Sequence, residues 1–123
     1  MILKFDFKSA VPIYMQLRNQ IVMGNADGSL KPGEHLPSVR ALADESGINA
    51  MTVSKSYQLL KQEGYINTDR RRGTTVCENK AAPKLPGDTV DRLRLCISEL
   101  RLAGLKNDDI SELCRNLCEE EIK

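Results

Sequence analysis

The sequence predicts a mainly α-helical protein with one small β-hairpin. Apolar residues recur at helical spacing in several segments, which glycine and proline residues separate. The chain has three Tyr, two Phe and no Trp, which indicates an aliphatic core and favours helices over a β-sandwich. β-prone residues gather after Gly64. At 123 residues, the chain is long enough for one domain and a small appendage.

The first helix is expected over residues 12–23. Pro12 suits its opening turn, and apolar residues recur every four positions on one face, at Ile13, Leu17 and Ile21. The turn-rich stretch NADGSLKPGEHLP follows. Within it, the pair Pro32-Gly33 favours a type II turn with the glycine at positive φ.

Two short helices are expected next, formed by VRALADES and AMTVSKSYQLLKQE. Ser38 is a good N-cap for the first and Asn49 for the second, while Gly47 and Gly64 end them. Only Gly47 and Ile48 precede the cap residue Asn49 between the two helices, so the helices must meet at a steep angle. Two short helices joined by a tight, glycine-containing turn are typical of a helix-turn-helix.

A two-stranded hairpin is expected after Gly64. YINTD and GTTVC are β-prone, with Ile66 and Val76 available to the core, and RRRG lies between them. Three helices followed by a hairpin make a winged helix-turn-helix, which we expect to occupy residues 1–77.

Residues 78–87 are expected to form a linker, because they contain two prolines and lack periodicity. Residues 88–123 are expected to form a tail of two helices, the first capped by Asp88 and ended by Gly104, the second capped by Asn107. Two helices alone cannot bury their apolar stripes, so we expect the same stripes of a second subunit to cover them. The residues expected at this dimerisation surface are Val90, Leu93, Cys96, Ile97, Leu100, Ile110, Leu113, Cys114, Leu117 and Cys118.

Net charge indicates no class of partner, because 18 Lys and Arg nearly balance 17 Asp and Glu. The position of the charge is more informative, since Arg70 to Arg72 lie at the expected hairpin tip. An isolated arginine run is typical of a solvated loop. At the tip of a wing beside a recognition helix, the same run indicates contact with the DNA backbone or minor groove, where the potential is most negative.

The third helix is expected to divide into two faces. Val53, Tyr57 and Leu60 form its buried stripe, and the opposite face begins with small, hydrogen-bonding or cationic residues and no acidic ones. A recognition helix enters the major groove by its N-terminal end, close to which Arg40 is expected. The residues expected to contact DNA are Ser38, Arg40, Asn49, Ala50, Met51, Thr52, Ser54, Lys55, Arg70, Arg71, Arg72, Gly73 and Thr74.

The stretch LKPGEHLPSVRALADESGINAMTVSKSYQLLKQEGYI, followed by RRRGTTV, resembles the N-terminal domain of the GntR family of bacterial transcription regulators. The specific part is the L-x-P-G-x-x-L-P-S-x-R-x-L-A core from Leu30 to Ala43. The resemblance implies a homodimer that binds palindromic operators through Arg40, residues 49–55 and residues 70–74. The short helical tail is similar to that of the YtrA subfamily, which implies a role in dimerisation.

Two departures from the family pattern bear on the operator sequence. Asn49-Ala50-Met51 stands where relatives often have Asn-Pro-Asn or Asn-Arg-Asn. In the wing, Arg72-Gly73 stands where many have Gly-x-Gly, and Thr75 where an aromatic residue is common.

Two alternative functions are open. The tail cysteines Cys96, Cys114 and Cys118 are candidates for a metal or oxidant sensor, but they lie on apolar stripes and the single histidine, His35, is distant, so we expect packing and no metal or cofactor. A winged helix used only for protein–protein assembly predicts an acidic or apolar outer face on the third helix and a neutral wing, and this chain has neither.

We therefore expect a cytoplasmic transcription regulator, a repressor that binds an inverted-repeat operator as a homodimer. No nucleophile and base stand at a recognisable spacing and no phosphate-binding glycine loop occurs, so an enzyme is not expected. The sequence shows neither a signal peptide nor a membrane-spanning run. A small-molecule effector, if there is one, is not identified by these residues.

Overall fold

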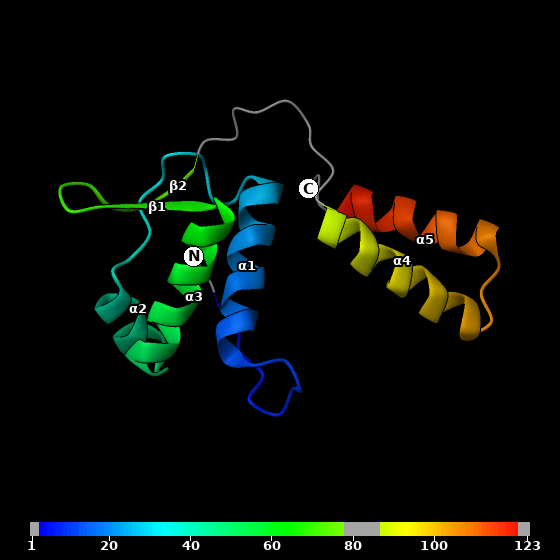
Figure 1. The fold of residues 1–123 in the computed structure, drawn as a ribbon, viewed down its shortest axis with the longest axis horizontal. Helices are drawn as coiled ribbons and strands as arrows, with labels where there is room; N and C mark the ends of the chain where they lie inside the picture. The colour runs from blue at the N-terminus through cyan, green and yellow to red at the C-terminus, as the bar shows by residue number, and fades with distance from the viewer. Residues whose placement is uncertain (1–2, 78–86, 121–123) are drawn as a thin grey trace. The chain divides into compact units, whose positions relative to one another are not determined.

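The computed structural model describes residues 3–77 and 87–120, which belong to two compact units, Met1–Asn79 and Lys80–Lys123 (Figure 1). The first unit contains α1 (Ile13–Asp27), α2 (Val39–Ser46), α3 (Ala50–Glu63), β1 (Ile66–Asp69) and β2 (Gly73–Val76). The second contains α4 (Gly87–Leu102) and α5 (Asn107–Glu120). The expected winged helix-turn-helix and two-helix tail are confirmed as elements of the fold.

Local capping defines α2 and α3, whose bounds match those predicted. The Ser38 hydroxyl oxygen accepts the Ala41 N–H at 3.1 Å, and the Asn49 side-chain oxygen accepts the Met51 N–H at 2.7 Å. At the end of α3, Gly64 is left-handed and the Tyr65 N–H donates to the Leu60 carbonyl at 2.9 Å, as in a Schellman motif. Short-range signals therefore suffice to place both helices.

The first helix, α1, is longer than predicted. It continues past Met23 to Asp27 and ends before Gly28, which has a φ of 86°. Gly24 is buried against Leu30, where an added Cβ would lie 3.0 Å from the leucine side chain. The stretch that reads as a turn in the sequence is held helical by this packing, which no local pattern reveals.

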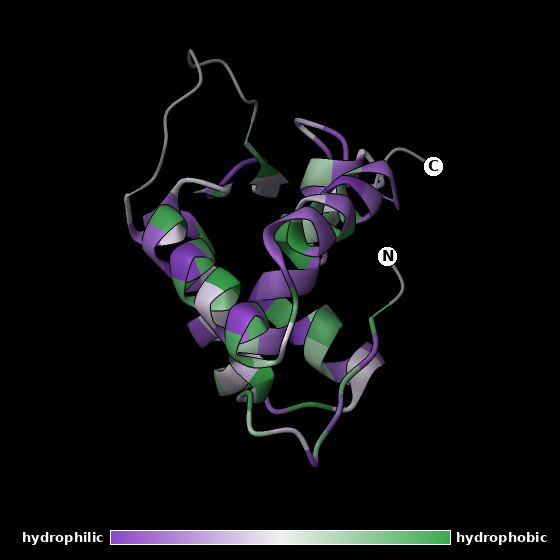
Figure 2. Cartoon of the chain, turned by 90° about the vertical axis from the view of Figure 1, so that its right-hand side faces the viewer, coloured by the Kyte–Doolittle hydropathy of each residue, from purple (hydrophilic) through white to green (hydrophobic). Residues whose placement is uncertain are grey.

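The core of the first unit joins all three helices to the hairpin. Hydrophobic and hydrophilic residues alternate along the helices (Figure 2). Helix α3 packs on both α1 and α2, and its buried stripe of Val53, Tyr57 and Leu60 is confirmed. The buried hydrophobic residues are Leu17, Ile21, Leu30, Leu36, Leu42, Ala43, Ile48, Val53, Tyr57, Leu60, Ile66 and Val76.

A third segment of the same chain pairs with the hairpin. Strands β1 and β2 pair antiparallel, with Ile66 opposite Val76 and Asp69 opposite Gly73. Residues 33–36 run along the other edge of β2, where the Leu36 N–H donates to the Thr74 carbonyl at 2.8 Å and the Val76 N–H to the Glu34 carbonyl at 2.9 Å. Within this segment, His35 is paired with Thr75.

The type II turn predicted at Pro32-Gly33 leads into this pairing. Gly33 has a φ of 81°, and the Glu34 N–H donates to the Lys31 carbonyl at 3.0 Å. The pairing that follows connects the base of the wing to the start of α2.

The N-terminal segment lies along α1, held by two glutamines one turn apart. The Gln20 side chain accepts the Lys4 N–H at 3.0 Å and donates to the Lys4 carbonyl at 2.6 Å. Gln16 makes the same pair of bonds with Asp6, at 2.9 and 2.8 Å. Each glutamine side chain thus offers the N-terminal segment one acceptor and one donor, as the backbone of a neighbouring strand would.

In the tail, both predicted N-caps differ from the structure. Helix α4 already includes Gly87, so Asp88 lies inside its first turn and supports the helix through its charge. At α5, the Lys106 carbonyl accepts the Ile110 N–H at 3.0 Å, and the Asp109 carboxylate accepts the Lys106 N–H at 3.0 Å. Lys106 therefore occupies the cap position, while Asn107 instead accepts a bond from Arg101 at 3.2 Å. Gly104 follows the end of α4, as predicted.

Candidate nucleic-acid interface

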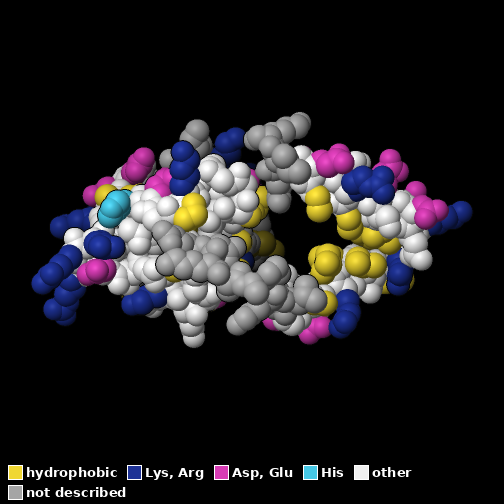
Figure 3. Space-filling view, turned by 90° about the horizontal axis from the view of Figure 1, so that it is seen from above, with side chains coloured by type: hydrophobic (Ala, Val, Ile, Leu, Met, Phe, Trp, Pro, Cys, Tyr) yellow, Lys and Arg dark blue, Asp and Glu magenta, His cyan; other side chains and the backbone are white. Residues whose placement is uncertain are grey.

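The wing tip presents its three arginines to solvent. Arg70, Arg71 and Arg72 are all exposed and form the loop between the paired residues Asp69 and Gly73. Figure 3 shows basic side chains projecting at the end of the first unit where the hairpin lies. No ion pair involves these arginines within residues 3–77 and 87–120, so their charges are available to an anion.

Backbone geometry keeps the wing tip tight. The Asp69 carboxylate accepts the Arg71 N–H at 2.9 Å, and Gly73 has a φ of 75°. A three-residue hairpin loop that closes on a left-handed residue favours glycine at that position, because a Cβ there is strained. Asp69 therefore closes the turn by accepting a backbone N–H, and the arginine side chains remain exposed to solvent.

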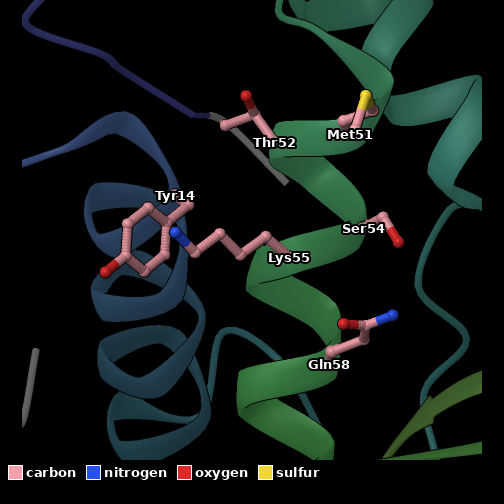
Figure 4. Close-up of a pocket in the computed structure, with 6 residues that line it drawn as sticks. All are labelled: Tyr14, Met51, Thr52, Ser54, Lys55 and Gln58. Atoms are coloured by element: carbon pink, nitrogen blue, oxygen red, sulfur yellow. The ribbon is translucent and has the colours of Figure 1, made fainter.

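The first half of α3 displays the outer face that the sequence predicts. Ala50, Met51 and Lys55 are exposed, with Met51 at 80%, whereas Thr52 and Ser54 are half-buried. A shallow hollow on this face is lined by Tyr14, Met51, Thr52, Ser54, Lys55 and Gln58 (Figure 4). No acidic residue lines it. The hollow therefore offers hydroxyl, amide and cationic groups together with one exposed thioether.

Two residues of this hollow, Tyr14 and Gln58, are absent from the predicted set. Gln58 follows Ser54 by four positions on α3, so helical spacing alone predicts it. Tyr14 belongs to α1, and its place beside α3 depends on how the two helices pack. In Figure 4 the Lys55 side chain extends from α3 to the Tyr14 ring, where its ammonium nitrogen lies 4.1 Å from the ring centroid.

The starts of α2 and α3 bring three further predicted residues to the surface, while Thr74, on β2, is half-buried. Ser38, Arg40 and Asn49 are exposed. The capping bonds occupy one acceptor on Ser38 and one on Asn49, and leave the serine O–H and the asparagine NH₂ as donors. These residues lie outside the hollow on α3.

A buried tyrosine fastens the segment before α2 to α3. The Tyr57 hydroxyl donates to the Pro37 carbonyl at 2.8 Å. Burial raises the pKa of Tyr57 to about 12, so the phenol remains a neutral donor at neutral pH. This bond restrains the segment before Ser38 relative to the middle of α3.

The C-terminal half of α3 is held by an ion pair on the side of α1. Nε and Nη2 of Arg18 donate to the two carboxylate oxygens of Glu63 at 2.9 and 3.0 Å. The hydrogen bonds from Arg18 to Glu63 raise the pKa of Arg18 above its ordinary value, and the guanidinium also lies 5.6 Å from the centroid of the Tyr65 ring. The pair fixes α3 against α1 next to the point where the chain enters β1.

The tail presents the apolar stripes that the sequence predicts at a dimerisation surface. No residue of α4 is buried, and Ile110 is the one buried residue of α5. Figure 3 shows hydrophobic side chains gathered along these two helices. Of the predicted residues, the half-buried ones are Val90, Ile97, Leu100, Leu113 and Cys114, and the exposed ones are Leu93, Cys96, Leu117 and Cys118. Leu95 and Leu102, at 61% and 90% exposure, were not predicted.

The described part of the chain contains no group of three or more His, Cys, Asp or Glu arranged to hold a metal ion. Cys77, Cys96, Cys114 and Cys118 are free thiols. None of the helices in the described ranges has the length and apolar character needed to cross a bilayer.

Comparison with known proteins places the chain in a family. Residues 10–76 match the model of the bacterial regulatory proteins of the gntR family. The chain is 35% identical over 118 residues to the transcriptional repressor YtrA of Bacillus subtilis, covering 94% of this chain and 91% of YtrA.

Solved structures agree. A transcriptional antiterminator of Listeria monocytogenes superposes with a TM-score of 0.91 at 28% identity, covering 100% of this chain and 94% of its own. YtrA of Sulfolobus acidocaldarius, a GntR-family transcription factor, superposes with a TM-score of 0.66 at 36% identity, covering 83% of this chain and 99% of its own. The chain therefore belongs to the gntR family of bacterial regulatory proteins, which are DNA-binding transcription regulators and not enzymes.

Proposed function

We propose that the chain represses transcription by binding an inverted-repeat operator as a homodimer. The observation that carries this proposal is the combination, in one unit, of an acid-free outer face on α3 and a wing tip with three exposed arginines. A helix reads bases in the major groove with short polar and cationic side chains, and arginines bind the phosphates and minor groove beside it.

The roles of the individual residues follow from their positions. Arg40 and residues 49–55 would read base edges, because they lie at the exposed starts of α2 and α3. Residues 70–74 would bind the backbone and minor groove. Ser38 would donate its hydroxyl proton to a phosphate while its oxygen keeps the cap. In this division, residues 1–77 bind DNA and residues 88–123 dimerise. The linker predicted at residues 78–87 lies outside the described residues except for Gly87, which begins α4.

The tail supports the homodimer. Its two helices fully bury only Ile110 among the residues described, and several apolar side chains stay exposed, so an equivalent surface on a second copy is a natural partner. Pairing would place two recognition helices about 34–36 Å apart, one turn of DNA, which requires an inverted repeat. In the dimer, Cys96 and Cys118 would be covered as small apolar side chains, and we propose no metal, cofactor or redox role for them.

Repression is proposed by analogy with relatives, and a cytoplasmic location is proposed because the expected ligand is bacterial DNA. YtrA of Bacillus subtilis is a transcriptional repressor, whereas the Listeria protein is described as an antiterminator. In vitro transcription separates these roles. A repressor lowers initiation at a promoter that carries the bound site, while an antiterminator raises read-through at a terminator and leaves initiation unchanged.

The binding experiment uses the full chain and a duplex that it selects from a random-sequence library. Arg40→Ala should weaken binding to this duplex by about 1–3 kcal/mol and relax its base preference, measured by fluorescence anisotropy. Replacing Arg70, Arg71 and Arg72 by Ala should weaken selected and mixed-sequence duplexes alike and flatten the salt dependence. Lys61→Ala, an exposed change at the other end of α3, is the matched control and should bind as wild type.

Unchanged affinity in both arginine variants would reject this interface. A chain that remains monomeric at micromolar concentration and still selects an inverted repeat would reject the dimer. A triple Cys→Ser variant at Cys96, Cys114 and Cys118 tests whether these cysteines sense metal or oxidant. We expect neither peroxide nor zinc to change the DNA affinity of the wild type or of the variant.

A further inference from the structure

Lys55 is exposed on the outer face of the first half of α3, and its ammonium group lies beside an aromatic ring. The nitrogen lies 4.1 Å from the centroid of the Tyr14 ring, within the range of a cation–π interaction. Tyr14 belongs to α1, which supplies none of the residues that read DNA in the proposed interface. Both side chains line the hollow on the outer face of α3 (Figure 4).

We propose that Tyr14 is a positioning residue of the DNA interface, which acts by fixing the Lys55 side chain over its ring before DNA arrives. This inference rests on the proposed function, because it requires α3 to be the recognition helix. It extends the functional surface to α1 and gives a half-buried residue of the scaffold an effect on affinity.

The first argument concerns entropy. A lysine side chain that moves freely in water loses most of its rotamer freedom when it binds a phosphate, and this loss opposes binding. A lysine already held over a ring has lost part of that freedom in the unbound protein. The free energy of association is then more favourable, as for any preorganised group.

The second argument concerns charge. A carboxylate partner would also hold Lys55 in place, but it would neutralise the cation that DNA attracts. An aromatic ring is uncharged and contacts one side of the ammonium, so N–H donors on the other side remain free for a phosphate. No ion pair involves Lys55 among residues 3–77 and 87–120, and its side chain is exposed. The ring therefore orients the cation without cancelling its charge.

The experiment is a double-mutant cycle in the full chain, with the duplex that the wild-type protein selects from a random library. Tyr14→Leu removes the ring, Lys55→Met removes the charge and keeps the straight side chain, and the double variant completes the cycle. Tyr14→Phe keeps the ring and is the matched control. Affinity is measured by fluorescence anisotropy, and thermal unfolding shows whether each variant is folded.

Tyr14→Leu should weaken binding by about two- to five-fold in the wild-type background, the range of an exposed cation–π contact. It should have no further effect in the Lys55→Met background. Tyr14→Phe, which keeps the aromatic ring, should bind with the affinity of the wild-type protein. This pattern cannot arise from a tyrosine that only stabilises α1, since such a loss would persist without Lys55.

Two results would overturn the inference. An equal loss from Tyr14→Leu in both backgrounds would assign the tyrosine to the fold, and unchanged or tighter binding would show that the ring does not prepare Lys55 for DNA. Arg40→Ala is measured alongside, because its loss of affinity tests the proposed interface independently of Tyr14. If Arg40→Ala weakens binding and Tyr14→Leu does not, the role of Tyr14 fails and the interface stands.

Discussion

The two units of the chain differ in how completely they bury their apolar residues. In the winged-helix unit, Leu17, Ile21, Val53 and Leu60 have no exposed surface. In the tail, α4 has no buried residue, and Leu93 and Leu117 are each about half exposed, at 52%. Burial of apolar surface is the dominant favourable contribution to folding. The first unit therefore contains its own core, whereas we expect the tail to complete its core by association.

The largest expected effect comes from placing a charge on the tail surface. Leu117→Asp should disrupt the dimer, because a carboxylate would be buried at the interface without a partner. Operator affinity should then fall on the order of a hundredfold or more, because binding through two linked modules is lost. Sedimentation equilibrium and fluorescence anisotropy measure the two effects.

Leu102→Asp is the matched control for this change. Leu102 is 90% exposed and lies outside the predicted stripe, so its variant should remain dimeric and bind DNA as wild type. If both variants are dimeric, the tail does not pair through the surface that contains Leu117.

A core substitution in the winged-helix unit should have the next largest effect. Leu60→Ala leaves a cavity beneath α3 and should lower the free energy of unfolding of this unit by about 2–5 kcal/mol, measured by urea denaturation. The loss should not depend on protein concentration, because this core lies within one chain. A concentration-dependent loss would mean that the first unit also relies on association.

The tail should behave in the opposite way on dilution. Its thermal transition should fall in temperature as the total protein concentration is lowered, since folding and association are coupled. The transition of the winged-helix unit should stay fixed. Differential scanning calorimetry over a range of concentrations measures both, and two concentration-independent transitions would contradict the proposed dimer.

The smallest effect should come from the start of α5. Asp109→Ala removes the carboxylate that accepts the Lys106 N–H and lies in the positive first turn of the helix. It should destabilise the tail by about 0.5–1 kcal/mol and leave the winged-helix transition unchanged. Circular dichroism melts resolve this difference, and a shift in both transitions would mean that the two units unfold together.

The sequence predicted those elements whose limits depend on local signals. Ser38, Asn49 and Gly64 define α2 and α3 through bonds to near neighbours, so their pattern is sufficient. The extra turns of α1 depend on the packing of Gly24 against Leu30, and the pairing of residues 33–36 depends on β2, about forty residues away. Contacts between residues that are distant in the sequence produce no periodic pattern from which they could be predicted.

In the candidate interface, too, local patterns could be predicted from the sequence and contacts between distant segments could not. Residues on the outer face of α3 could be predicted because helical spacing separates them from the buried stripe. Tyr14 could not, since its position beside Lys55 exists only once α1 and α3 have packed. Residue type indicated correctly that Arg70 to Arg72 would be exposed, but the role of Asp69 in closing the loop depends on the turn geometry.

The pairing of residues 33–36 with β2 has a consequence for how this regulator diverges among its relatives. Backbone hydrogen bonds between residues 33–36 and β2 anchor the base of the hairpin, while residues 70–72 at its tip contribute nothing to the buried core. Substitutions at residues 70–72 can therefore accumulate at little cost to stability. If the proposed interface is correct, the same scaffold can change its overall affinity for DNA through a few substitutions at these exposed positions.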